Sequence, residues 1–161
     1  MLNTASVKLI KDELSMLSNK ELVLIIGSLI KFKKENKELV TYLLFDSKDE
    51  LEYIKSVKKD METELEVVNK FNVRNFLKLI RRTLRNTKKA IKFSGKPETE
   101  VQLLIHFLAI LEEKKLPFNR FKALVTIWDR TIISIGKSIN LLHEDLRYDY
   151  TNELKALADR Q

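Results

Sequence analysis

The sequence predicts an all-α protein, a helical bundle or a short stack of helical hairpins with about eight helices, in a single domain of residues 1–161. Three observations predict it. Apolar residues recur at three- and four-residue spacing along nearly the whole chain, which is helical periodicity. The three glycines and two prolines are too few to form the turns of a sandwich or barrel. At this length, one ordinary domain can bury its own core.

The first half of the chain is expected to form four helices. The first covers residues 5–17, the second ends near residue 34, a short third follows, and the fourth is acidic, between residues 46 and 66. Polar residues that accept hydrogen bonds from the free N–H groups of a first helical turn mark where the second, third and fourth helices begin. These expected caps are Ser18 with Glu21, Asn36, and Ser47 with Glu50. The second helix carries its apolar residues Leu22, Ile25, Ile26 and Leu29 at helical spacing.

The fifth and sixth helices are separated by a short turn. Asn72 is expected to open the fifth helix, which runs to about residue 93 and stops at Gly95, a residue that readily adopts the left-handed conformation found at helix ends. Pro97 suits the first turn of the sixth helix, where its missing N–H has no partner to lose. Because the sixth helix is apolar on most sides, we expect it to lie at the centre of the fold.

The last two helices follow Pro117. Residues 131–135 are rich in β-branched side chains, as a strand would be, but the apolar stripe from residue 121 to residue 142 fits one face of a helix over its full length. The sequence therefore predicts a seventh helix with Trp128 buried on its core side. An eighth helix is expected over residues 144–158.

The chain resembles a family of small, all-helical bacterial proteins catalogued as a domain of unknown function. The resemblance spans most of the chain and implies the same helical fold, but the family has no assigned activity from which site residues could be transferred. The sequence departs from the family pattern in two places: no proline follows residues 42–45, and residues 117–120 replace a glycine–aspartate turn. The segments that carry the resemblance are Lys11-Asp12-Glu13-Leu14, Glu21-Leu22, Tyr42-Leu43, Lys88-Lys89-Ala90-Ile91 and Leu141-Leu142-His143-Glu144-Asp145-Leu146.

The fifth helix carries the strongest local signal, which is positive charge. Residues 67–97 contain ten lysines and arginines and no acidic residue, whereas the whole chain has a net charge of +7. At about 100° per residue, eight of these cations fall within an arc of about 120°. They form the candidate binding surface: Arg74, Lys78, Arg81, Arg82, Arg85, Lys88, Lys89 and Lys92.

Such a surface has three main interpretations, beside docking to an anionic membrane. An acidic protein surface is the expected partner, with the chain acting as a non-enzymatic binding or adaptor protein. The alternative is a nucleic acid bound through its phosphates alone, because Asn75 and Asn86 lie off the basic arc and aromatic residues for base stacking are few. The third interpretation is a solvated face whose charge is balanced by the acidic fourth helix packed antiparallel beside it.

Catalytic and metal chemistry finds little support in the sequence. The absence of cysteine excludes disulfide frameworks, thiol catalysis and thiolate metal sites. His106 and His143 lack the spacing of zinc or di-iron sites. We expect His106 to be a core or rim histidine with a partner. We expect His143 to cap the C-terminus of the seventh helix. An enzyme built on dispersed carboxylates such as Asp129, Glu144 and Asp145 is the remaining alternative. We expect no enzyme activity, no cofactor and no metal.

The expected location is the cytoplasm. The longest apolar stretch, residues 103–111, is far shorter than the roughly 20 residues of a membrane span. The first residues of the chain lack the apolar core of a signal peptide.

Overall fold

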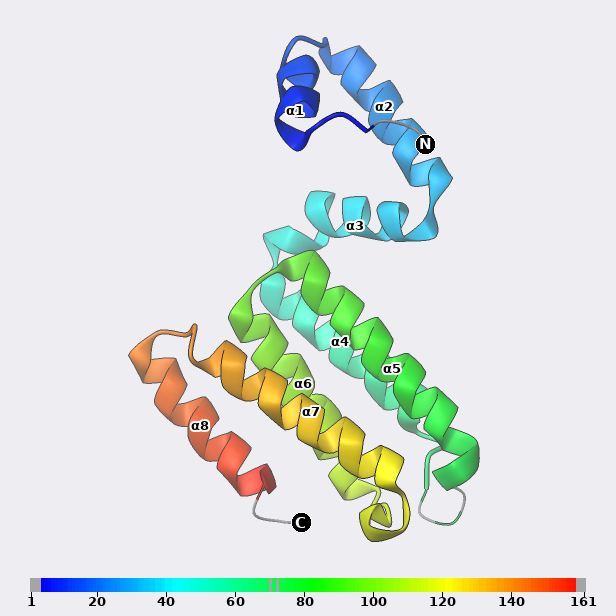
Figure 1. Cartoon of the computed structure of the whole chain (residues 1–161), viewed down its shortest axis with the longest axis vertical. Coiled ribbons are helices and arrows are strands. Elements are labelled where there is room, and N and C mark those ends of the chain that lie inside the picture. Colours follow the sequence, from blue (N-terminus) through cyan, green and yellow to red (C-terminus); the bar gives the residue numbers. More distant parts are fainter. Residues whose placement is uncertain (1–3, 70, 72, 159–161) are drawn as a thin grey trace. The chain divides into compact units, whose positions relative to one another are not determined.

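The computed structural model describes residues 4–69, 71 and 73–158, and this part of the chain forms eight α-helices, two short 3₁₀ helices and no strand (Figure 1). The predicted all-α class and the predicted number of helices are therefore confirmed. The chain divides into two compact units, which we call unit 1 (Met1–Phe45) and unit 2 (Asp46–Gln161) and describe separately. A single domain over residues 1–161 stays a prediction.

Unit 1 consists of α1 (Val7–Ser15), α2 (Asn19–Phe32) and α3 (Lys34–Leu44), with α2 packed against α3. The predicted capping box is confirmed: the Ser18 N–H donates to Glu21 Oε2 at 2.8 Å, and the Glu21 N–H donates to Ser18 Oγ at 3.4 Å. The first helix is shorter than predicted because Ser6 caps it, accepting from the Leu9 N–H at 3.2 Å.

The prediction that Asn36 caps the third helix is wrong. Helix α3 already begins at Lys34, so Asn36 lies inside its first turn. There the Asn36 side chain donates to the carbonyl of Leu29 in α2, at 2.8 Å. The amide therefore joins two consecutive helices instead of opening one.

Unit 2 is built around α6 (Pro97–Glu113), which contacts four other helices. These are α4 (Glu50–Leu65), α5 (Val73–Ser94), α7 (Lys122–Ile139) and α8 (Glu144–Ala158), and Figure 1 shows α4 and α5 running side by side. The 3₁₀ helices are η1 (Asp46–Lys48) and η2 (Phe118–Arg120). Nine residues of α6 are buried, which confirms its predicted central position.

The start of α4 differs from the prediction. Asp49, not Ser47, is the N-cap, and its Oδ1 accepts from the Glu52 N–H at 3.0 Å. Ser47 lies in η1, and the Glu50 carboxylate bonds to residues around the α5–α6 turn. The capping box predicted from Ser47 and Glu50 is therefore wrong, because a nearer carboxylate occupies the cap position.

The turn between α5 and α6 follows the prediction. Gly95 has a φ of 67°, the left-handed conformation, and its N–H donates to Ile91 O at 2.8 Å. Pro97 is the first residue of α6, as expected. Asn72, the residue expected to open α5, lies outside the described residues.

The segment with strand-like composition is helical, and residues 131–135 lie inside α7. Trp128 is buried, as predicted, and its ring meets that of Phe118 edge to face, with centroids 5.2 Å apart and an interplanar angle of 77°. The eighth helix has the predicted bounds.

Candidate functional site

The eight predicted cations, which we call the basic face, lie on the side of α5 that points away from the core. Val73, Ile80, Thr83 and Thr87 are the buried residues of this helix. At about 100° per residue, their directions spread around a point roughly opposite the centre of the basic arc. Burial of α5 against α4 and α6 therefore turns the basic face towards solvent.

Seven of the eight side chains are exposed, and Lys89 is half-buried. None of the seven forms a hydrogen bond or an ion pair with another residue in the described ranges. The exposed members are Arg74, Lys78, Arg81, Arg82, Arg85, Lys88 and Lys92. The face runs from residue 74 to residue 92, and these 18 residue steps correspond to about 27 Å of helix.

Helix α4 lies antiparallel to α5, as the third interpretation of the charge supposed. Near the end of α4, Glu64 accepts hydrogen bonds from the Thr83 hydroxyl at 2.6 Å and from the Asn86 amide at 3.3 Å. Earlier in α4, the Tyr53 hydroxyl donates to the carbonyl of Ala90 at 3.1 Å.

No carboxylate of α4 forms an ion pair with the seven exposed cations in the described ranges. At the start of α4, Glu50 accepts from the hydroxyls of Ser94 and Thr99 and from Lys96 Nζ, the last at 2.9 Å. Both Glu50 and Glu64 thus bond to groups outside the basic arc. The seven exposed cations therefore form no direct ion pair with α4 in the described part of the chain, and a solvated face balanced by this acidic helix stays a prediction.

The surroundings of the basic face offer little for reading bases. The Asn86 amide is bonded to Glu64, and the ring of Phe76 is half-buried against the core of unit 2. Phe93 is also half-buried. The face thus presents charge and long flexible side chains, and Phe71, which is exposed just before α5 begins, is the aromatic ring placed to stack on a base.

The two histidines differ in their surroundings. His106 is partly buried, as predicted for a core or rim histidine, and its Nε2 lies 2.9 Å from Glu62 Oε1. Burial lowers the pKa of His106 below its usual value, the nearby Lys58 adds to the lowering, and Glu62 opposes it.

The prediction that His143 caps the seventh helix is wrong. His143 is exposed, lies just before α8 and pairs with Asp145, its Nδ1 being 3.3 Å from Oδ2. The Arg147 side chain instead donates to the carbonyls of Asn140 and Leu142, just after α7 ends, at 3.1 and 3.0 Å. A longer cation from the following helix thus binds the carbonyls that the histidine was expected to meet.

The three carboxylates considered for a catalytic site are exposed. Asp129 lies in the middle of α7, whereas Glu144 and Asp145 form the first turn of α8. Within residues 4–69, 71 and 73–158, no group of three or more histidine, aspartate or glutamate side chains could hold a metal ion. The geometry therefore gives the enzyme alternative no assembled site.

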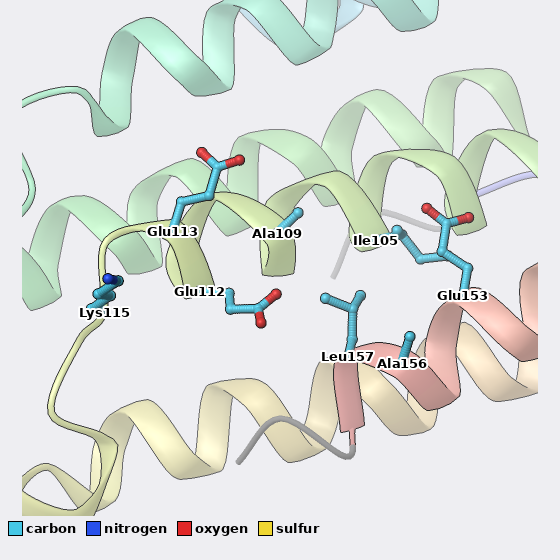
Figure 2. A pocket seen from close by; sticks show the side chains of 8 residues that line it. All are labelled: Ile105, Ala109, Glu112, Glu113, Lys115, Glu153, Ala156 and Leu157. Carbon is cyan, nitrogen blue, oxygen red and sulfur yellow. The ribbon is translucent and has the colours of Figure 1, made fainter.

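A concavity of about 470 Å³ lies between α6 and α8 (Figure 2). Ile105 and Leu157 supply apolar surface, Glu113 and Glu153 supply carboxylates, and the Glu112 carboxylate points towards Leu157 in Figure 2. The described residues that line it include no serine or histidine, and Lys115 lines it together with the three glutamates.

Comparison of the chain with protein-family models, with curated proteins and with solved structures gave no match. The resemblance to a helical bacterial family therefore stays a prediction. Among the described helices, none has both the length and the apolar composition that crossing a membrane requires.

Proposed function

We propose that this chain is a binding protein that engages an acidic protein partner through the basic face of α5. The observation that carries the proposal is the set of seven exposed cations without an internal partner among the described residues. Carboxylates are available on the neighbouring helix, yet they bond to hydroxyl, amide and ammonium groups elsewhere.

The basic face opposes the stability of its own helix. Five pairs of its cations are four residues apart and four pairs are three residues apart, so that neighbours on the helix surface carry the same charge. Each like-charged pair destabilises a helix by about 0.2–0.5 kcal/mol. An anionic partner would convert this repulsion into attraction, whereas the fold alone gains nothing from it.

The spacing of the cations suits a helical partner. Arg74, Lys78, Arg81, Arg85, Lys88 and Lys92 are separated by four, three, four, three and four residues. Acidic residues at the same alternating spacing form a continuous stripe on a second helix, and a helix that crosses α5 at about 20° keeps such stripes together. The proposed partner therefore presents an acidic helix.

The test measures binding to a helical peptide with glutamates at this spacing and to a peptide of the same composition in scrambled order. The test variant carries Arg81→Glu, Arg82→Glu and Arg85→Glu. The control carries Lys122→Glu, Arg130→Glu and Lys137→Glu, three exposed residues of α7 that change the net charge equally. Wild type and control should bind the patterned peptide, and the basic-face variant should lose binding.

Mixed-sequence DNA and RNA form the second arm, measured across a salt series. Tighter binding of nucleic acid than of either peptide, with affinity falling steeply as salt rises, would assign the basic face to phosphates and overturn the acidic partner. If no probe binds at low salt, the basic face is only a solvated surface.

A further inference from the structure

Helix α2 has the composition of a buried helix but no buried residue. Eight of its fourteen residues are large and apolar, at positions 22–26, 29, 30 and 32. Val23, Leu24 and Phe32 are 68%, 71% and 76% exposed. Helix α6, similarly apolar on most sides, buries nine residues among four neighbours. A helix that is apolar all round is normally buried by other elements. We therefore infer that another surface packs against α2, and we call this surface the cover of α2.

Unit 1 cannot supply that cover. It has 45 residues, whereas a domain of about 60 residues hides only about 60% of its surface and is already marginal in stability. Tyr42 is the one buried residue among those described in unit 1, and the principal helix contact there is between α2 and α3. Fourteen large apolar side chains of unit 1 are each more than a third exposed. Together they offer roughly 1,000 Å² of apolar surface, more than the area of about 800 Å² that each partner contributes to a standard interface.

We propose that unit 1 is a homodimerisation element in which α2 packs against unit 1 of a second copy of this chain. The occupant must bring apolar surface to several sides of α2, which a flat membrane surface does not do. Unit 1 of a second copy presents the same apolar side chains on its own α1 and α2. Packing of the two copies against each other would bury both sets in one apolar core. Obligate dimer interfaces have this character, and pairing through the same surface on both copies gives a closed twofold dimer.

The described residues of unit 2 offer no matching surface. Six large apolar side chains are exposed among them, and these six are distributed over α4, α7, α8 and two connections. The predicted apolar face of α2, in contrast, is continuous and spans an arc of about 100°. No charged residue interrupts this arc, so two copies can meet there without repulsion. Its members are Leu22, Ile25, Ile26 and Leu29.

Sedimentation of the full chain from about 1 to about 100 µM tests the dimer, because mass action makes association concentration-dependent. Wild type should be a dimer at the upper end, and Ile26→Glu should shift the dissociation constant at least tenfold or leave a monomer. The matched control is Ile133→Glu, an exposed isoleucine of α7 in unit 2, which should behave as wild type. Emission from Trp128, which is buried in unit 2, verifies the fold of that unit, and far-ultraviolet circular dichroism verifies that Ile26→Glu keeps the helices of unit 1.

Single cysteines give a second measurement in a chain that has none of its own. Ile26→Cys should form a disulfide-linked dimer on mild oxidation, whereas Ile133→Cys should do so far more slowly. A wild type that remains monomeric throughout would overturn the proposal and leave unit 2 or a different protein as the cover of α2. Equal behaviour of the two glutamate variants, or equal cross-linking of the two cysteine variants, would overturn it as well.

Discussion

The bond between Glu64 and Thr83 is predicted to set the rotation of α5 about its axis, and therefore the direction of the basic face. The Thr83 hydroxyl is buried, at 1% exposure of the residue, and donates to Glu64 Oε2 at 2.6 Å. Asn86 donates to the other carboxylate oxygen at 3.3 Å. Replacing Glu64 with alanine removes both acceptors and leaves the buried hydroxyl without this partner.

The expected loss of stability follows from these contacts. A hydrogen bond to a charged group contributes about 1.5–3 kcal/mol, and a bond as long as that from Asn86 contributes at the lower end or below. Glu64→Ala should therefore lower the free energy of unfolding by about 2 kcal/mol. Thr83→Val removes the same short bond together with the hydroxyl, so the double variant should lose less than the sum of the single losses. The expected coupling is about 1 kcal/mol or more.

Urea unfolding followed through Trp128 emission measures all three variants, because this single tryptophan lies in the same unit. Asn86→Ala is the control for the weaker bond and should lower stability by less than half as much as Glu64→Ala. If the coupling between Glu64 and Thr83 is below about 0.5 kcal/mol, within the additivity expected of independent sites, the bond does not fix the orientation of α5.

Two further predictions concern other parts of unit 2. Gly95→Ala should lower the free energy of unfolding by about 1–2 kcal/mol, because φ is 67° there and a side chain disfavours that conformation. Since no atom lies within 4 Å of the added Cβ, a much larger loss in urea unfolding would contradict backbone strain as the cause. His106 has a lowered pKa in the folded state, so the unfolded chain binds a proton more readily, and stability should fall as the pH drops below about 6.5. His106→Gln should remove this part of the pH dependence. If the free energies of unfolding of wild type and variant differ by the same amount at pH 8 and at pH 5, His106 does not cause the loss of stability.

The sequence predicts helices well here because the apolar spacing is a property of each segment alone. The bounds of α8 and the central position of α6 follow directly from that pattern. Caps are harder to predict, since the same Ser-x-x-Glu pattern occurs at residues 18–21 and 47–50 but only the first forms a capping box. At the second, Asp49 places a carboxylate closer to the free N–H groups, and Glu50 finds hydroxyl partners more than 40 residues away.

The basic face could be located from sequence for a similar reason. Once residues 73–94 are helical, their spacing fixes which side chains share a direction, and the apolar residues fix which direction is buried. The partners of the α4 carboxylates could not be located this way, because they depend on the register between two antiparallel helices. The error at His143 has the same origin: sequence does not reveal that Arg147, reaching back from α8, arrives at the carbonyls beyond α7.

The basic face of α5 and the apolar face of α2 would bind their partners through different forces, and the dependence of binding on salt distinguishes them. Association through the basic face of α5 depends on charge and should weaken as added salt screens it. Association through α2 depends on apolar burial and should persist, or strengthen in sulfate, which favours burial of apolar surface. If dimerisation weakened steeply with salt while peptide binding did not, both assignments would be reversed: the basic face would form the dimer and α2 would bind the peptide. One salt series, measured for both, thus tests the assignment of each surface independently of any substitution.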